Sequence, residues 1–365
     1  MSSALQRPIL VMAGGTGGHV YPALAVARAL QAESKDVVWL GTHRGLESRI
    51  VPAAGIDIEW ISVKGLRRKG LLALLIAPLQ IVWALLQSLG VILRHRPAAV
   101  LGMGGFVSGP GGVAAWLTRR PLVIHEQNAA AGLTNRLLAR LARVVLQAFP
   151  GSFNSSVDAE TVGNPVREDI AAIPEPPARY SGREGPLRLL VLGGSQGALA
   201  LNLNVPAALA RIDAELRPVV RHQCGERTLD SARQAYGEHG VEVELVPFIE
   251  DMAAAYAWAD LVVCRAGALT VAELCAAGVP ALFVPYPAAV DDHQTANAGP
   301  MAAAGAGKII QESELTPELL AGLLREWLQS RAELQARAER ARALAAPNSL
   351  RRITELCLEQ AGGFA

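Results

Sequence analysis

The sequence predicts an α/β protein built from two similar halves, each of which opens with a strand, a glycine-rich loop and a helix. Its 365 residues suggest two domains rather than one. Apolar residues make up 51% of the chain and charged residues only 18%, which leaves ample material for buried cores. Short apolar runs of strand type alternate with Ala/Leu-rich helical patterns, and this alternation favours parallel sheets.

The first glycine-rich loop follows the apolar run 9–12 and precedes the helical pattern 23–30. Glycine allows left-handed backbone angles and a close approach by a ligand. A helix start also offers free N–H groups and the positive end of the helix dipole, which suit an anion. Four glycines fill this loop: Gly14, Gly15, Gly17 and Gly18.

The same order returns twice, after the apolar runs 100–103 and 187–192. The second loop contains Gly104 and Gly105, and the third runs from Gly193 to Gly197. Three such loops predict anionic groups held by backbone amides; three tight turns without a ligand are the alternative. No loop matches the complete dinucleotide fingerprint, and no acidic residue is placed for a dinucleotide ribose, so a dinucleotide oxidoreductase is disfavoured.

The remaining elements of each half follow from the same periodicity. In the first half we expect strands at 37–41, 56–61, 100–103, 122–124 and 144–146, with helices at 111–117 and 133–141. Five prolines and several charges in 164–186 are typical of a linker. In the second half we expect strands near 187–192, 218–222, 242–246, 261–264 and 280–284, and helices at 198–212, 271–277, 295–304, 317–329, 332–345 and 350–358.

Residues 71–93 carry no charge and are long enough to cross a bilayer as a helix. A span here would place the first two glycine loops on opposite sides of a membrane, so we favour a crossover helix. Small or mildly polar residues form one stripe that would pack inward: Ala73, Ala77, Gln80, Ala84, Gln87 and Ser88. The bulky apolar side chains on the other faces of this helix would stay exposed, and basic residues at both helix ends, here called the basic collar, would suit anionic lipid. A fully buried helix is the alternative. The collar consists of Arg67, Arg68, Lys69, Arg94 and Arg96.

Composition excludes several function classes. A net charge of +1 gives no overall attraction to nucleic acid. The four cysteines have no metal-ligand spacing and are expected to be buried thiols in a reducing compartment. We therefore expect no metal and no cofactor. The first residues pass directly into a strand, so no signal peptide is expected.

Two groups of polar residues stand where strands end. His125, Glu126 and Asn128 follow one strand of the first half, a position where open parallel sheets place functional groups. Thr270 and Glu273 follow a strand of the second half. Their spacing fits a helix capping box, but a carboxylate there could equally accept hydrogen bonds from both ribose hydroxyls of a nucleotide.

The motifs GGTGGHVYPALAVA, GMGGFVSGPGG, HEQNA, GNPVR, GGSQGA and CRAGALTVAE followed by DDHQ occur in one order from about residue 8 to residue 358. In this the chain resembles the MurG family of bacterial N-acetylglucosaminyltransferases. The resemblance implies the GT-B architecture, in which two Rossmann-like domains face each other across a cleft. It implies an acceptor-binding, membrane-associating domain at 1–163, a linker at 164–186, a UDP-GlcNAc-binding domain at 187–346, and a C-terminal helix at 347–365 that returns to the first domain.

The implied reaction is an inverting transfer of GlcNAc from UDP-GlcNAc to the C4 hydroxyl of undecaprenyl-pyrophosphoryl-MurNAc-pentapeptide. By the same resemblance, Glu273 contacts the ribose, Ile249 the uracil, and Gln294 the sugar. The other implied donor contacts are Thr16, Gly17, Gly18, Asn128, Arg167, Ser195, Gln196, Ala268, Leu269, Thr270, Val271 and Ala272. The candidates for the general base are His19, His125 and Glu126, with His19 favoured because it closes the first glycine loop; a structural role for His19 is the alternative.

The acceptor pyrophosphate is expected at Gly14, Gly15, Gly104 and Gly105. The expected location is the cytoplasmic face of the inner membrane, with the protein held peripherally by anionic lipids; other cell-wall synthesis proteins remain candidate partners. Three alternatives stay open. They are a different lipid glycosyltransferase of this architecture, a UDP-GlcNAc epimerase, and an integral membrane or lipid-carrier-binding protein built around residues 71–93.

Overall fold

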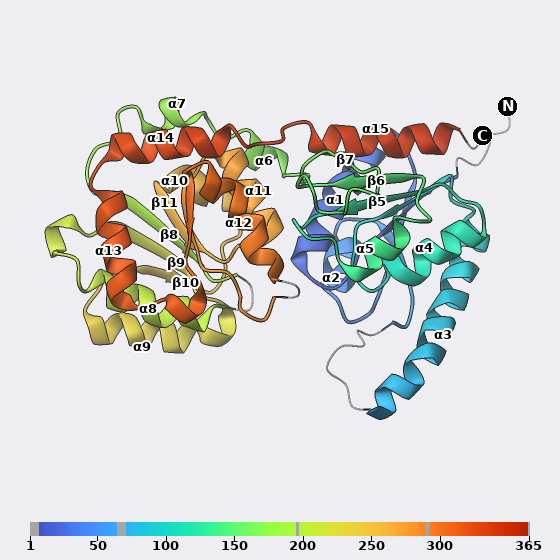
Figure 1. Ribbon diagram of the computed structural model, residues 1–365, viewed down its shortest axis with the longest axis horizontal. Helices are drawn as coiled ribbons and strands as arrows, with labels where there is room; N and C mark the ends of the chain where they lie inside the picture. Colours follow the sequence, from blue (N-terminus) through green and yellow to red (C-terminus); the bar gives the residue numbers. More distant parts are fainter. Residues whose placement is uncertain (1–6, 64–70, 195–196, 290–291, 364–365) are drawn as a thin grey trace. The chain divides into compact units, whose positions relative to one another are not determined.

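The computed structural model describes residues 7–63, 71–194, 197–289 and 292–363, and within helix α3 it describes the side chains from Ala77 onward. The chain forms two compact units. Unit 1 consists of residues 1–165 and 348–365, and unit 2 of residues 166–347 (Figure 1). Each unit is a parallel sheet with helices on both faces, as the alternation of strand and helix patterns predicts.

Unit 1 has a seven-stranded sheet in the order β3-β2-β1-β4-β5-β6-β7. Every neighbouring pair is parallel, and Met12 at the end of β1 pairs with both Leu40 and Gly102. The strands are β1 (Ile9–Met12), β2 (Val37–Gly41), β3 (Asp57–Trp60), β4 (Ala99–Gly102), β5 (Leu122–Glu126), β6 (Val144–Gln147) and β7 (Glu160–Thr161). The helices are α1 (Gly17–Ala32), α2 (Glu47–Ala53), α3 (Leu71–His95), α4 (Ser108–Leu117), α5 (Leu133–Leu138) and α15 (Ser349–Gly362).

The last helix of the chain, α15, belongs to unit 1 and packs on α1. Its apolar side chains Ile353, Leu356 and Cys357 are buried in the same core as Val11 and Val26. Because α15 lies some 200 residues from the sheet in sequence, this contact closes unit 1 with the end of the chain.

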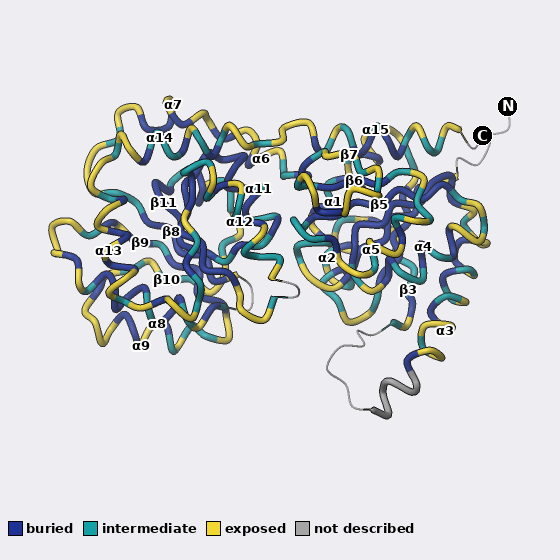
Figure 2. Tube along the Cα trace, in the orientation of Figure 1, coloured by how far each residue is buried: buried dark blue, intermediate teal, exposed yellow. Residues whose placement is uncertain are grey.

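Unit 2 has a six-stranded sheet in the order β10-β9-β8-β11-β12-β13, also parallel throughout. Its strands are β8 (Arg188–Leu192), β9 (Val219–Gln223), β10 (Glu244–Val246), β11 (Leu261–Cys264), β12 (Ala281–Phe283) and β13 (Gly307–Ile309). Its helices are α6 (Glu168–Ala171), α7 (Pro176–Tyr180), α8 (Leu199–Leu209), α9 (Leu229–His239), α10 (Met252–Trp258), α11 (Ala268–Ala277), α12 (His293–Ala303), α13 (Pro317–Leu328) and α14 (Arg331–Arg342). The buried strands of both units form the dark central layers of Figure 2.

The proline-rich segment 164–186, whose composition predicted a linker, differs from that prediction. It holds the short helices α6 and α7, and from residue 166 on it belongs to unit 2. Its side chains Arg179 and Tyr180 are buried. Prolines are compatible with the first turn of a helix, and Pro176 and Pro177 stand there in α7.

Helix α3 packs against α4 along one side and is exposed on the other (Figure 2). The small residues Ala77, Ala84 and Ser88 are buried, which confirms the predicted inward stripe at these positions. The bulky apolar face points outward. It consists of Leu79, Ile81, Val82, Trp83, Leu86 and Leu93. Residues 67–69 of the predicted basic collar lie outside the described residues, as does the side chain of Ala73.

Candidate active site

All three glycine loops lie where the strand order of a sheet reverses. In unit 1 the chain builds outward from β1 to β3 and then returns to place β4 on the other side of β1. In unit 2 the same reversal falls between β8 and β11. Loops at the carboxyl ends of two such strands diverge and leave a crevice, which is where open α/β sheets bind ligands. The topology therefore predicts a ligand site at this edge of each sheet.

In unit 1 the first and second glycine loops interlock. Gly104 and Gly105 have φ angles of +94° and +81°, which favour glycine. A Cβ on Gly105 would lie 2.3 Å from the carbonyl oxygen of Gly14, and one on Gly104 would lie 2.7 Å from the imidazole ring of His19. The ring of His19, in the first turn of α1, therefore packs against the second loop.

Some backbone N–H groups of these loops donate hydrogen bonds within the protein. The buried carboxylate of Glu47 accepts the N–H of Gly15 at 2.9 Å, and also the N–H and hydroxyl of Thr42 at 3.0 and 2.8 Å. The N–H of Gly104 donates to the Ser108 hydroxyl at 3.1 Å. An anion at this edge would instead meet the N–H groups at the start of α1, at Gly17 and Gly18, which have no partner within a helix.

His125 lies at the end of β5 and is fully buried. Its Nε2 lies 2.9 Å from the carbonyl oxygen of Gly163, and its Nδ1 lies 3.2 Å from the amide nitrogen of Gln127. Burial lowers the pKa of His125 to about 4, so the ring is neutral at physiological pH. Full burial and internal contacts of both ring nitrogens fit a role in holding the loop after β5.

The carboxylate of Glu126, one residue further, is also enclosed. One oxygen accepts the N–H and the side-chain amide of Asn128 at 2.9 and 3.1 Å. The other accepts the N–H of Gly132 and the side-chain amide of Asn135 at 3.1 and 2.8 Å. Four donors satisfy nearly all the capacity of a carboxylate. Glu126 therefore organises the loop that carries Asn128.

In unit 2 the helix α11 begins shortly after β11 and therefore starts at the edge of the sheet where the second ligand site is expected. Its N-cap is Gly267, so Thr270 lies within the first turn of the helix. The capping-box interpretation of Thr270 and Glu273 is therefore wrong. It failed because the predicted helix began at residue 271, three residues after the actual start at Ala268. The first turn of α11 contains no acidic residue, so no side-chain charge there opposes an anion at the positive end of the helix dipole.

Glu273 is buried on α11 and held by two side chains from other helices. The hydroxyl of Tyr256 on α10 donates to its carboxylate at 3.0 Å. The guanidinium of Arg167, the N-cap of α6, lies 3.8 Å from the second carboxylate oxygen. Burial raises the pKa of Glu273 to about 7, against the opposing effects of Arg167 and Tyr256.

This raised pKa predicts that the free energy of unfolding falls as pH rises. The stabilising contribution of the protonated carboxyl is present in full below the unfolded pKa near 4.5 and is lost as pH rises through the folded pKa near 7. We expect Glu273→Gln, which avoids the buried charge, to unfold at a higher temperature than the parent at pH 8. The gain corresponds to about 3 kcal/mol at most. At pH 4, below the unfolded pKa, the two proteins should unfold nearly alike in thermal scans; an equal shift at both pH values would contradict a perturbed Glu273.

Gln294 on α12 links the loops that follow β11 and β12. Its side-chain oxygen accepts the N–H of Ala266 at 3.2 Å and the N–H of Tyr286 at 2.9 Å. A ligand contact would therefore come from its amide nitrogen. The third glycine loop stands opposite, after β8, although Ser195 and Gln196 lie outside the described residues. The remaining candidate donor residues of this unit are Ile249 after β10, and Ala268, Leu269, Val271 and Ala272 on α11.

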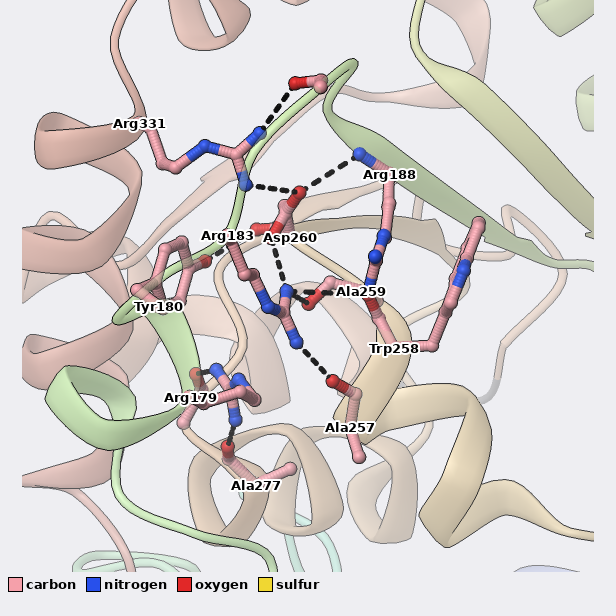
Figure 3. A network of polar contacts seen from close by, with 12 residues as sticks. Arg179, Tyr180, Arg183, Arg188, Ala257, Trp258, Ala259, Asp260, Ala277 and Arg331 are labelled. Atoms are coloured by element: carbon pink, nitrogen blue, oxygen red, sulfur yellow. Dashed lines mark hydrogen bonds and ion pairs between the residues drawn. The ribbon is translucent and has the colours of Figure 1, made fainter.

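Two arginines, the buried Arg179 and the half-buried Arg183, contact the carboxyl ends of α11 and α10 (Figure 3). Arg179 donates to the carbonyl oxygens of Ala277 and Gly278 at the end of α11. Arg183 donates to the last carbonyls of α10, including that of Ala257, and pairs with the buried carboxylate of Asp260. Cations at the carboxyl end of a helix satisfy its free carbonyls and oppose its dipole. The segment predicted as a linker thereby fixes the helices that carry Tyr256 and Glu273.

Glu273, Arg167 and Gln294 were predicted as donor contacts from the sequence, whereas Glu47 and Tyr256 were not singled out. Glu47 opens a helix of seven residues that has no clear apolar period. Tyr256 lies in the small-residue run MAAAYAW, which gives no indication that its hydroxyl faces a carboxylate. Among the described residues, no group of three or more His, Cys, Asp or Glu side chains is placed to hold a metal ion.

Comparison with known proteins identifies the family. Residues 9–147 match the glycosyltransferase family 28 N-terminal domain, and residues 188–353 match the C-terminal domain of the same family. The crystal structure of Acinetobacter baumannii MurG superimposes with a TM-score of 0.84 at 42% identity, covering 97% of this chain and 99% of that one. The chain belongs to the MurG family.

Other relatives of this MurG-family protein agree. It is 60% identical over 357 residues to a protein of Alkalilimnicola ehrlichii, covering 98% of this chain and all of that one. That relative is named UDP-N-acetylglucosamine–N-acetylmuramyl-(pentapeptide) pyrophosphoryl-undecaprenol N-acetylglucosamine transferase. The UDP-GlcNAc 2-epimerase of Neisseria meningitidis has a TM-score of 0.66 at 13% identity over 96% of this chain and 99% of that one, a likeness of fold alone. The two Rossmann-like units form the GT-B fold, as predicted.

Proposed function

We propose that this protein transfers GlcNAc from UDP-GlcNAc to the C4 hydroxyl of undecaprenyl-pyrophosphoryl-MurNAc-pentapeptide, with inversion at the anomeric carbon. Full-length similarity to proteins named for this transfer carries the proposal. The two units carry different groups, which suit the two substrates of this transfer. Unit 2 offers a buried carboxylate on a helix whose first turn has no acidic residue, and unit 1 offers a glycine-lined crevice with a histidine at its edge.

The donor is bound by unit 2 in this proposal. Glu273 accepts hydrogen bonds from the two ribose hydroxyls, while Tyr256 and Arg167 fix its orientation. The positive end of the α11 dipole faces the pyrophosphate. As UDP departs, negative charge develops on that pyrophosphate, and preorganised amides stabilise it. Gln294 contributes its amide nitrogen to the transferred sugar.

The acceptor is bound by unit 1, where we assign the general base to His19. Of the three candidates, His125 is fully buried with both ring nitrogens near internal partners, and the oxygens of Glu126 accept four internal donors. His19 is only partly buried and lies at the mouth of the crevice against Gly104. It therefore accepts the proton of the attacking C4 hydroxyl, while Asn128 is held by Glu126 for contact with the sugars.

The acceptor's lipid tail requires the protein to work at a membrane surface, and the exposed apolar face of α3 suits this task. Among the described helices, Ala77–His95 is long and apolar enough to cross a bilayer by length and composition, with 28% of its apolar window buried. Because its small residues pack on unit 1, we propose that it lies on the membrane and does not span it.

A basic pocket next to this face supports docking on anionic lipids. Helix α4, which packs against α3, ends in the exposed side chains Trp116 and Leu117. Behind them lies a hollow of about 240 Å³ lined by Trp116, Arg119, Arg120 and Arg143. Each basic residue near an anionic surface contributes about 1 kcal/mol, and this attraction weakens with salt.

The proposed function is tested by UDP release. With UDP-GlcNAc alone we expect almost no release of UDP, because no acceptor hydroxyl is present. Addition of a lipid-linked muramoyl-pentapeptide acceptor should raise the release rate at least a hundredfold. A related acceptor whose C4 hydroxyl is replaced by hydrogen is the matched control and should leave the rate at background. Equal UDP release with both acceptors, or formation of an epimerised sugar nucleotide, would contradict the transfer.

A further inference from the structure

A cavity of unit 1 lies next to the loop after β2, between the end of β3 and α3. It measures about 500 Å³, which is within the range of ligand sites. The loop after β2, the end of β3 and the outer face of α3 surround it. The residues that form it include His43, Arg44, Ile61, Val63, Leu79 and Trp83.

The cavity has a polar end, which carries the guanidinium of Arg44, and an apolar end. His43 and Arg44 are exposed on the loop after β2, and the described residues that line the cavity include no carboxylate. Ile61 forms part of the opposite wall, together with Leu79 and Trp83 of α3, which are 70% and 57% exposed. A site that combines a guanidinium and a neighbouring imidazole with adjacent apolar surface suits a molecule with an anionic head and a hydrocarbon tail.

The walls of this cavity are held in place by specific contacts. The ring of His43 stacks on Trp60 of β3 with centroids 4.2 Å apart. The N–H of Ser62 donates to the side chain of Gln87 at 2.8 Å and so ties the end of β3 to α3. The arrangement is therefore part of the packed fold of unit 1.

One carboxylate connects the cavity to the first glycine loop. Glu47 accepts the N–H of Gly15 in that loop and both donors of Thr42, which lines the cavity. The N–H of Leu46 also donates to the carbonyl oxygen of Gly15 at 3.2 Å. Through Glu47, one wall of the cavity is linked to the glycine loop where the acceptor sugar is proposed to bind. Another wall contains Leu79 and Trp83 of the apolar face of α3.

We infer that this cavity binds the prenyl pyrophosphate part of the acceptor, with the pyrophosphate at His43 and Arg44 and the first isoprene units against Leu79 and Trp83. This inference rests on the proposed function, because it assigns a place to one part of that substrate. It shifts the expected pyrophosphate contacts from Gly15 and Gly104, whose N–H groups have internal partners, to side chains of the neighbouring loop. The remaining tail continues along α3 into the bilayer.

Calorimetric titration with farnesyl pyrophosphate, which is soluble and requires no vesicle, tests the inference. We expect the full-length protein to bind it at least tenfold more tightly than it binds inorganic pyrophosphate or farnesol. Arg44→Ala and Trp83→Ala should each weaken binding about tenfold, and Arg44→Lys should restore part of the loss. The matched controls are Arg49→Ala on α2 and Leu86→Ala on α3, which are exposed and do not line the cavity; both should bind as the parent does.

Transfer kinetics in detergent separate this site from membrane docking and from donor binding. Arg44→Ala and Trp83→Ala should raise the KM for the lipid-linked acceptor and leave the KM for UDP-GlcNAc unchanged. Farnesyl pyrophosphate binding that is unaffected by both changes, or equally reduced in both controls, would overturn the assignment. Because the titration needs no turnover, an absence of transfer with normal prenyl pyrophosphate binding would instead count against the proposed function.

Discussion

His19→Ala is expected to lower kcat by a factor of 10² to 10⁴ with little change in the KM for UDP-GlcNAc. The C4 hydroxyl of a sugar is a weak nucleophile whose proton must be accepted as the new bond forms. His19 is the partly exposed candidate at the crevice mouth, since His125 and Glu126 are enclosed by internal partners. Steady-state kinetics with saturating acceptor measure the effect.

A structural role for His19 would give a different pattern. His19 rests against Gly104, so its removal could loosen the two loops without removing a base. In that case the acidic limb of the pH dependence of kcat would persist in His19→Ala, whereas loss of a general base abolishes that limb. His239→Ala, at the exposed end of α9, is the matched control and should keep full activity. A kcat for His19→Ala within tenfold of the parent would contradict the assignment.

Glu273→Ala is expected to raise the KM for UDP-GlcNAc at least a hundredfold. At pH 8, above the folded pKa of Glu273 near 7, two ribose hydroxyls lose a charged acceptor, and each such hydrogen bond contributes about 1.5–3 kcal/mol. A tenfold change in affinity corresponds to about 1.4 kcal/mol, so the combined loss reaches two orders of magnitude. Because α11 keeps its N-cap and its buried apolar face, the variant should fold.

Donor analogues provide the control for this prediction. UDP-GlcNAc that lacks the 2′ or 3′ ribose hydroxyl should bind the parent more weakly but should bind Glu273→Ala as well as the complete donor does. Tyr256→Phe should raise the donor KM by a smaller factor, since the carboxylate remains but loses the hydroxyl that orients it. Glu273→Ala that still discriminates between the complete and deoxy donors would contradict the ribose assignment.

The sequence predicted the sheets well because buried parallel strands are continuous apolar runs. Residues 9–12, 37–41 and 261–264 were all expected as strands and form β1, β2 and β11 with these bounds. The glycine loops were equally clear, since strand, glycine turn and helix follow one another three times. Weakly periodic elements were missed: α2 and α10 have seven residues each, and β13 has three.

The site was less predictable than the fold because its side chains meet across long stretches of sequence. Glu273 was found through its motif, but its environment depends on Tyr256 and Arg167, and Arg167 lies on the segment predicted as a linker. That segment was misjudged because proline and charge are typical of linkers, whereas Arg179 and Arg183 are buried or half-buried against helix ends. No local pattern indicates such contacts.

The most direct measurement of the transfer is the structure of the product. UDP-GlcNAc labelled in its sugar is incubated with the protein and the lipid-linked muramoyl-pentapeptide, and the lipid phase is analysed by NMR spectroscopy. We expect the label in the lipid phase, joined through a β linkage to C4 of the muramoyl sugar, because the donor is an α-linked sugar nucleotide and one displacement inverts its anomeric carbon. Label that stays in water as free or epimerised sugar, or that reaches the lipid through an α linkage, would contradict an inverting transferase.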